Sequence, residues 1–357
     1  MSSLHLVTAG LSSCLTLLAS SSSAAPVTPA PRDPVEWPFS VDSPWNTPLG
    51  TGVASEPADA PCSRLLRDEK LGIDINAAQW SHPIYVATAS DPLLKVIVAG
   101  KSVATMRVPK AAEPAQPRSE DSDAHLHIID PEHRYVHELW HARRRKDGQL
   151  QAEGYTRNDL HGPGVGEGGE RAYGGSAIGG LIRRSELTAG IRHALAMALP
   201  RGHLRLGPVW PATKQDNGAE SSYHGAVPMG QLVTLPVKTN LDELGLSPEG
   251  RAIARALLDY GAYVVDASSD LAFYAEPSAE PDLERARADL AKLRPLLRCV
   301  QNASQQQLGG PGARVAPLAP ALAPPSPAPA TLAPAAASAT TAKAKSAATG
   351  PKGKAPR

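Results

Sequence analysis

Cysteine is scarce in this sequence, which limits the kinds of site that the chain can build. The 357 residues contain three cysteines, Cys14, Cys62 and Cys299. None has the close spacing of a cysteine-based zinc site, so such a site is excluded. Once an N-terminal signal is removed, Cys62 and Cys299 remain as an even pair that an oxidising compartment would join, stabilising the fold by roughly 4 kcal/mol. The alternative is two buried free thiols.

The N-terminus lacks both basic residues and a long hydrophobic run. Its apolar stretch ends near Leu18 and is too short to cross a bilayer as a permanent helix. Small residues at Ser23 and Ala25 fit a signal-peptidase site. We therefore predict a signal peptide at residues 1–25 and a secreted protein. A second interpretation makes Leu11–Cys14 a lipoprotein box, with the protein lipid-anchored through Cys14.

The C-terminal segment lacks aromatic and acidic residues. Residues 303–357 are dominated by Ala, Pro, Ser and Thr, which cannot bury enough apolar surface to offset the entropy of ordering. We predict a disordered Ala/Pro/Lys-rich tail there. Its basic residues carry about +6 of charge, which leaves about −5 for the rest of a chain whose net charge is +1. The body is therefore not expected to bind nucleic acid. The charge does not predict an oligomeric state.

The body has no internal repeat and no regular alternation of strands and helices. Residues 26–60 are rich in proline around Trp37, Phe39 and Trp45, which predicts an extended segment that packs its aromatic rings. In residues 61–302, short stretches rich in Val and Ile end at Pro, Gly or Asp, as strands do. These stretches are 82–89, 94–99, 103–108, 126–129, 191–199, 231–237 and 261–266.

Helical patterns are fewer than strand patterns. They occur at 62–70, around 184–189, at 247–260, where Ser247 and Pro248 form a helix start, and at 281–300. We therefore predict a mainly β fold, a β-sandwich or jelly-roll-like core with a few α-helices. The glycine-rich stretch 162–180 lacks the Gly-Lys-Ser/Thr ending of a phosphate-binding loop, so we interpret it as a loop beside a site.

The string His137-Glu-Leu-Trp-His141 has the HExxH form of zinc peptidases. On a helix, His137 and His141 would share a face and bind zinc, with Glu138 activating the metal-bound water. In the competing hairpin, 126–129 is one strand, 130–133 turns, and 135–142 is the returning strand. The two imidazoles would then lie too far apart for easy joint coordination. Zinc is expected only on the helical interpretation, and no other cofactor is expected.

Several separated blocks resemble a largely uncharacterised family of exported bacterial proteins. The blocks are Pro44-Trp-Asn46, Asp123-Ala-His125 continuing to Asp130, Glu138-Leu139, Gly180-Leu-Ile-Arg183, Glu186-Leu187, Gly190-Ile-Arg-His-Ala-Leu195, Val209-Trp-Pro-Ala212, Pro228-Met-Gly230, and Tyr260-Gly261 with Asp266. They span roughly residues 40–270. The family pattern has an acid at Glu138 but other residues at His137 and His141, which favours the hairpin.

The candidate catalytic residues lie in these blocks. Asp123 and His125 are two apart and point to one face of a strand, as does His127, and His-x-His can bind a metal. Glu186 and His193 flank Gly190 and would meet at one rim, and Arg183 would hold a carboxylate. The candidate set is therefore Asp123, His125, Glu138, Arg183, Glu186 and His193. For each of these residues, a structural hydrogen bond or ion pair is the competing interpretation.

These residues suggest two classes of function. The first is a secreted carbohydrate-active enzyme, a glycosidase or polysaccharide lyase, acting on extracellular or cell-envelope polysaccharide through carboxylate and histidine groups. The second is a non-catalytic extracellular binding or envelope-structural protein. Convergence of Asp123, His125, Glu138, Glu186 and His193 on one cleft would favour the enzyme, and their dispersal would favour the structural protein.

Overall fold

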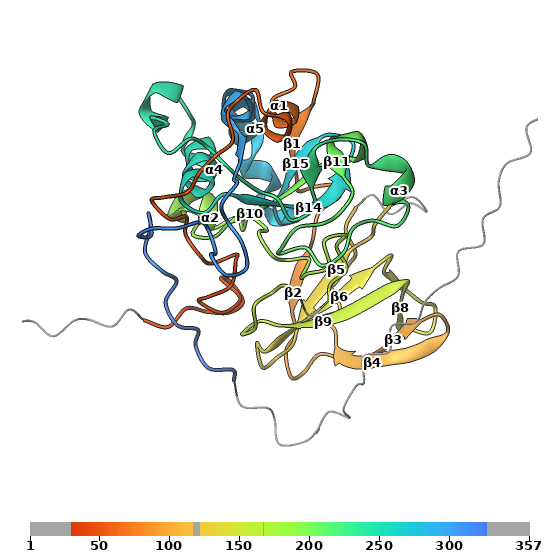
Figure 1. The fold of residues 1–357 in the computed structure, drawn as a ribbon. Helices are drawn as coiled ribbons and strands as arrows, with labels where there is room; N and C mark the ends of the chain where they lie inside the picture. The colour runs from red at the N-terminus through yellow and green to blue at the C-terminus, as the bar shows by residue number, and fades with distance from the viewer. Residues whose placement is uncertain (1–29, 117–121, 167, 327–357) are drawn as a thin grey trace, which may run out of the picture.

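The chain folds into a large mixed sheet with its helices, joined to a smaller β-sandwich (Figure 1). This computed structural model describes residues 30–116, 122–166 and 168–326. Strands predominate, so the prediction of a mainly β fold with a few helices is confirmed. Residues 1–25 with the predicted signal peptide and Cys14, and residues 327–357 of the predicted tail, lie outside the described residues.

The large sheet has six strands in the order β1-β15-β10-β14-β13-β16. Their bounds are β1 Ile73–Asn76, β10 Leu195–Pro200, β13 Leu232–Thr234, β14 Ala262–Ser268, β15 Leu271–Tyr274 and β16 Arg298–Cys299. The pairs β1·β15 and β10·β14 are parallel and the other pairs antiparallel. The central strand β10 is buried from Leu195 to Leu199, which explains its continuous apolar sequence.

Most of the helices lie on the side of this sheet away from the sandwich, and the short helix α3 lies at one edge (Figure 1). The α-helices are α1 Pro61–Leu66, α2 Glu186–Ala189, α3 Ala219–Ser222, α4 Pro248–Asp259 and α5 Glu284–Leu293. Short 3-10 helices are Arg201–His203, Leu241–Leu244, Pro277–Asp282 and Arg294–Leu296. The predicted start of α4 is confirmed, because Ser247 Oγ accepts a hydrogen bond from the Gly250 N–H at 3.0 Å.

The sandwich consists of two four-stranded sheets around a core of their own. One has the order β2-β5-β6-β9, with bounds Ile84–Val86, Leu126–Ile129, Tyr135–Trp140 and Gly154–Asp159. The other has the order β4-β3-β8-β7, with bounds Lys101–Arg107, Leu93–Val98, Leu150–Ala152 and Arg143–Arg144. A separate parallel pair joins β11 Leu204–Arg205 to β12 Val227–Pro228.

The sheet β2-β5-β6-β9 contributes to both hydrophobic cores. Side chains alternate along a strand, so Leu126 and Ile128 of β5 enter the sandwich core while Ile129 packs in the core of the large sheet. In β6, Leu139 packs in the sandwich core and Val136 packs in the core of the large sheet. His127 of β5 and Glu138 of β6 therefore lie on the face of this four-stranded sheet that is turned toward the large sheet. This alternation places polar groups at the junction of the two parts.

The HExxH string lies on strand β6 and not on a helix. Residues 130–133 form the predicted turn, in which Asp130 N–H donates to the Tyr135 carbonyl at 3.0 Å. Leu126 then pairs with Leu139 and Ile129 with Val136 in an antiparallel hairpin. The hairpin interpretation is therefore correct, and the helix that would bring His137 and His141 to one zinc ion is absent.

The segments at both ends of the described chain pack against the body. Trp37, Phe39 and Trp45 are buried, and the N-terminal segment forms no helix within residues 30–60. Arg32 pairs with Leu322 in a β-bridge, and Arg314 donates to the Pro48 carbonyl at 3.1 Å. The structured chain thus continues past residue 302, where the sequence placed the start of the tail, to at least residue 326.

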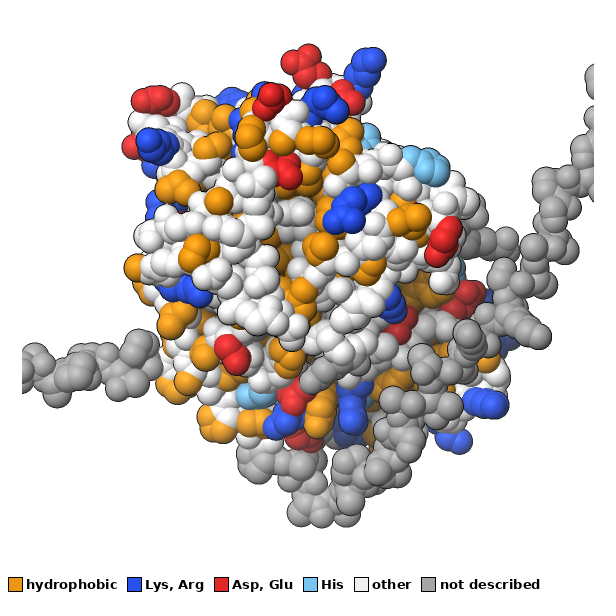
Figure 2. Space-filling view, viewed as in Figure 1, with side chains coloured by type: hydrophobic (Ala, Val, Ile, Leu, Met, Phe, Trp, Pro, Cys, Tyr) orange, Lys and Arg blue, Asp and Glu red, His pale blue; other side chains and the backbone are white. Residues whose placement is uncertain are grey.

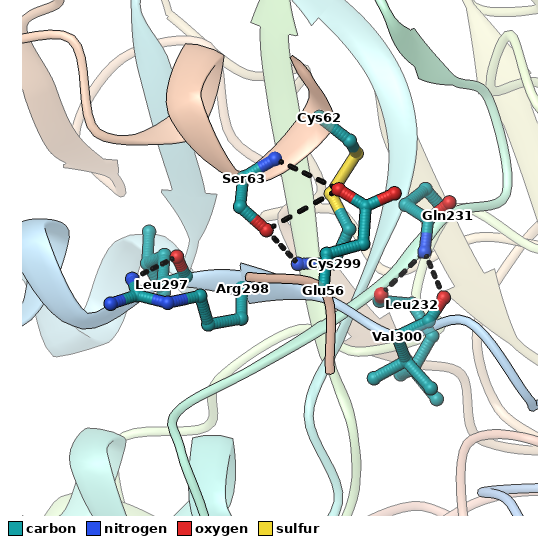
Figure 3. The surroundings of a disulfide bond; sticks show 9 residues. All are labelled: Glu56, Cys62, Ser63, Gln231, Leu232, Leu297, Arg298, Cys299 and Val300. Carbon is teal, nitrogen blue, oxygen red and sulfur yellow. Dashed lines mark hydrogen bonds between the residues drawn. A yellow bond between two sulfur atoms is a disulfide. The ribbon is translucent and has the colours of Figure 1, made fainter. Parts of the chain in front are cut away.

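Cys62 of α1 and Cys299 of β16 form a disulfide, as predicted (Figure 3). Their Cα atoms are 6.1 Å apart and 237 residues separate them in sequence. Beside the bond, the Ser63 hydroxyl oxygen accepts from the Cys299 N–H at 3.1 Å, and the Ser63 N–H donates to Glu56 at 3.3 Å. The bond ties the start of the body to its last strand.

In the described part of the chain, no helix has the length and apolar character needed to cross a membrane. On the face drawn in Figure 2, acidic and basic side chains are interspersed with hydrophobic ones and do not gather into a single charged patch.

Candidate functional site

A polar cluster lies where the sandwich meets the large sheet. It contains His82, His125 and His127, which are 1 %, 4 % and 0 % exposed, together with Arg171 and Tyr274. The parallel pairing of β2 with β5 places Ile84 opposite His127 and brings His82, two residues before Ile84, beside the histidines of β5. Tyr274 ends β15 of the large sheet, and its ring centroid lies 5.4 Å from that of His82. We call these five residues the junction cluster.

The three imidazoles of the junction cluster contact one another. His82 Nδ1 lies 3.0 Å from His127 Nε2, and the ring centroids of His82 and His125 are 4.4 Å apart. Burial lowers the pKa values of His82 and His127 well below the usual range and that of His125 to about 4. The positive charge of Arg171 lowers all three pKa values further. The imidazoles are therefore neutral at pH 7.

Arg171 is the buried cation of this cluster. It is 1 % exposed, and none of its three side-chain nitrogens has a hydrogen-bond partner in the described part of the chain. Its guanidinium carbon lies 3.9 Å from the centroid of the Tyr274 ring, which is a cation–π contact. A buried charge is costly without a hydrogen-bonded partner, and the Glu138 and Asp266 carboxyl groups interact electrostatically with this guanidinium.

Two aspartates accompany Arg171 at this junction. Burial of the Asp266 carboxyl group raises its pKa to about 7; Arg171 opposes the rise, and Asp216 and Asp123 add to it. Asp123 is exposed and accepts a hydrogen bond from Trp140 Nε1 at 3.1 Å. The cluster thus extends from buried imidazoles to an exposed carboxylate beside a partly exposed indole.

Glu138 holds the glycine-rich loop against β6. Its carboxylate accepts a hydrogen bond from the Ser176 hydroxyl, from the Ala177 N–H at 2.9 Å and from the Thr156 hydroxyl at 3.5 Å. Burial raises the pKa of Glu138 to about 7, although the hydrogen bonds from Ser176 and Ala177 act in the opposite direction. With these contacts, Glu138 positions the loop that carries Arg171.

The two histidines of the HExxH string are engaged separately. His137 Nδ1 lies 2.8 Å from the Tyr155 hydroxyl, on the face of β6 opposite Glu138. His141 lies beyond the end of β6, where its Nδ1 is 3.2 Å from a Glu153 carboxylate oxygen and its ring stacks on Trp140. The predicted alternative of zinc bound by His137 and His141 therefore does not fit this geometry.

The other three candidate residues form a second network around the Gly190 turn. Glu186 and His193 meet as predicted, with Glu186 Oε2 3.0 Å from His193 Nε2. Arg183 donates from Nε to Glu276 at 2.9 Å and from Nη1 to the Val35 carbonyl at 3.1 Å. No hydrogen bond or ion pair among the described residues links this network to Asp123, His125 or Glu138. The candidate residues thus divide into two groups and do not converge on one cleft, an outcome that favours the non-catalytic protein over the enzyme as the sequence framed it.

His193 has both ring nitrogens engaged in this second network. Its Nδ1 lies 2.9 Å from the Ala194 carbonyl oxygen, so both ring nitrogens face acceptors. Burial lowers the pKa of His193, but the Glu186 carboxylate and its hydrogen bond raise it, and the net change is a rise. The adjoining cavity, bordered by Trp37, Asn46 and Arg183, holds about 20 Å³, room for about one water molecule and not a sugar. The polar groups of Glu186, His193 and Arg183 are therefore satisfied within the protein.

His82 and Arg171 belong to this site, although neither stands in a sequence motif that predicts a site residue. His82 stood only as the first residue of a strand pattern, 43 residues before His125, with no local motif around it. Arg171 lies within the glycine-rich stretch that was interpreted as a loop beside a site. This interpretation was the sequence feature that could have indicated Arg171. No protein-family model, curated protein or solved structure matches this chain, so the likeness to a family of exported bacterial proteins rests on its sequence blocks alone.

Proposed function

We propose that this protein is a carbohydrate-active enzyme, a glycosidase or polysaccharide lyase that acts on an acidic extracellular polysaccharide at the junction cluster. The observation that carries the proposal is the buried guanidinium of Arg171, whose nitrogens have no hydrogen-bond partner in the described chain. A guanidinium binds a carboxylate through two parallel hydrogen bonds. The carboxylate of a uronic-acid residue would supply the missing acceptor.

The acid and base groups of this proposal are the two aspartates near Arg171. Asp266, with a pKa near 7, retains a proton that it can donate to a leaving oxygen at neutral pH. Asp123 is exposed and interacts electrostatically with Asp266. Two carboxyl groups in unlike environments can divide the acid and base roles. Trp140, which donates to Asp123, offers an aromatic face for a sugar ring.

The two reaction classes differ in what they consume. A glycosidase would transfer the Asp266 proton to the glycosidic oxygen while water adds to the anomeric carbon. A lyase would remove the proton next to the uronate carboxylate and expel the glycosidic oxygen, leaving a carbon–carbon double bond and consuming no water. Arg171 would neutralise the carboxylate in either case, and its role in charge stabilisation is greater for the lyase.

A panel of acidic and neutral polysaccharides tests this proposal. We expect the purified protein to release reducing ends from an acidic polymer, and ultraviolet absorbance of the product distinguishes elimination from hydrolysis. Arg171→Met and Asp266→Asn should each reduce the rate by about 10²-fold or more. Arg192→Met, which removes an exposed guanidinium stacked on Trp37, should retain the rate. Equal rates for Arg171→Met and the unsubstituted protein would refute the proposal.

A non-catalytic binding or envelope-structural protein is the second candidate. It is favoured by the network of Arg183, Glu186 and His193, whose polar groups are satisfied by one another and by the backbone. On this alternative, the protein would bind an acidic polysaccharide without cleaving it. Retention of the polymer on immobilised protein, with no new chain ends, would support this candidate over the enzyme.

A further inference from the structure

The hydrogen bond between His82 and His127 does not account for the position of His125 in the junction cluster. One ring nitrogen from each lies within 4.8 Å of the other two. His82 Nδ1 and His127 Nε2, 3.0 Å apart, can share one proton. The Nδ1 atoms of His125 and His127 have no hydrogen-bond partner in the described chain, although both residues are more than nine-tenths buried. The unpaired Nδ1 of His125 is therefore available as a ligand, and His127 can offer its Nε2 beside His82 Nδ1.

We infer that His82, His125 and His127 bind a divalent transition metal ion of the zinc class. Imidazole is a preferred ligand of such ions, and two imidazoles on one tetrahedral zinc ion place their nitrogens about 3.4 Å apart. The 3.0 Å separation of His82 and His127 is close to that value. Three histidine ligands leave a fourth position for water or substrate, as in catalytic zinc sites.

The charged groups around these imidazoles oppose one another. Arg171 repels a metal ion, but Asp123 lies near enough to His125 to oppose this positive charge, and Asp266 interacts with Arg171. The carboxylates therefore offset the cationic charge around the ion.

The site differs from the one that the HExxH string suggested. His127 and His82 come from neighbouring parallel strand segments, whereas His141 lies beyond β6 beside Glu153. His141→Gln is thus a matched control, because it removes an imidazole from the same hairpin without touching the three-histidine group. The metal site stands whether or not the protein cleaves a polysaccharide.

Metal binding to the purified full chain tests this inference. The protein is first stripped with a chelator and then titrated with Zn²⁺ alone. We expect one Zn²⁺ per chain, with X-ray absorption of the loaded protein showing three imidazole ligands. His127→Gln and His82→Gln should each weaken Zn²⁺ binding at least 10-fold. His141→Gln should bind Zn²⁺ as the unsubstituted protein does.

Two results would overturn the inference. One is the absence of stoichiometric Zn²⁺ uptake by the unsubstituted protein, a measurement that does not depend on the folding of any variant. The other is a loss of affinity in His141→Gln equal to that in His127→Gln, which would place the ion in the HExxH string. Circular dichroism of each variant separates loss of a ligand from loss of the fold.

Discussion

Glu186 and His193 form a buried ion pair in which the carboxylate oxygen and the imidazole Nε2 are 3.0 Å apart. The pair spans the Gly190 turn, where φ of 91° favours glycine. His193 also donates to the Ala194 carbonyl, so the turn is fixed by both ring nitrogens. This pairing connects α2 to the start of β10, the central strand of the large sheet.

The ion pair predicts how stability depends on pH. The folded pKa of His193 is raised above its usual value of 6.5, so its contribution is fully present below pH 6.5 and is lost as pH rises through the folded pKa. Urea unfolding of the protein and of His193→Gln between pH 5 and 9 measures this contribution. We expect the difference between them to shrink as pH rises, and a constant difference would contradict the assignment of His193 as a cation.

Removal of Glu186 alone should be strongly destabilising. Glu186→Ala leaves the buried imidazolium without its counter-ion, and breaking such a pair costs about 3–5 kcal/mol. Chemical denaturation at pH 6 measures this loss. Arg251→Ala, which removes an exposed ion pair with Asp242, is the control and should change stability by less than about 1 kcal/mol. If both variants lost the same free energy of unfolding, the buried Glu186 pair would stabilise the protein no more than an exposed ion pair does.

Glu138 is predicted to act by positioning the glycine-rich loop. In Glu138→Gln the amide oxygen can still accept from Ser176 and Ala177, so we expect a small loss of stability. In Glu138→Ala, the buried Ser176 hydroxyl and Ala177 N–H would lose their acceptor, at a cost of about 1–3 kcal/mol for each unsatisfied group. Thermal unfolding compares the two variants, and hydrogen exchange at Ala177 reports on the loop. A Gln variant as unstable as the Ala variant would mean that the charge itself is required.

Arg171 should reveal a conflict between stability and function. Because its buried guanidinium has no hydrogen-bond partner in the described chain, replacement by methionine of similar shape is expected to leave the free energy of unfolding unchanged or higher. The same variant should lose activity on, or binding to, an acidic polysaccharide. Urea unfolding tests the first expectation. Destabilisation by several kcal/mol would indicate instead that Arg171 is a structural residue.

The Cys62–Cys299 disulfide should contribute substantially to stability because it closes a loop of nearly the whole body. Cys62→Ser with Cys299→Ser should lower the free energy of unfolding by about 2–5 kcal/mol. Denaturant titrations with and without a reducing agent give the same comparison in the unsubstituted protein. If reduction leaves the denaturation midpoint unchanged, the bond does not stabilise the folded chain in this way.

Features that depend on neighbouring residues were predictable from the sequence. The Ser247 cap with Pro248 located the start of α4, and the turn at residues 130–133 between two apolar runs located the β5–β6 hairpin. The same hairpin decided against an HExxH helix. With the signal set aside, two cysteines leave one possible intramolecular pair, so composition offered the Cys62–Cys299 bond against two free thiols, and the structure has the bond. Helix capping, turn chemistry and residue periodicity depend on residues only a few positions apart, so they can be recognised in the sequence.

The composition of the candidate site was decided by tertiary structure. Sequence spacing grouped His125 with Asp123 and His127, but the parallel pairing of β2 with β5 added His82. The glycine-rich loop carried Arg171 to the same junction, while Glu186 and His193 closed a separate ion pair. The sequence by itself indicated the local elements, and it offered the hairpin against an HExxH helix and the disulfide against two free thiols. Which distant polar groups meet depends on strand order and on the register of the parallel strands. Strand order and register are set by the burial of both hydrophobic cores together, and no short segment of sequence contains that information.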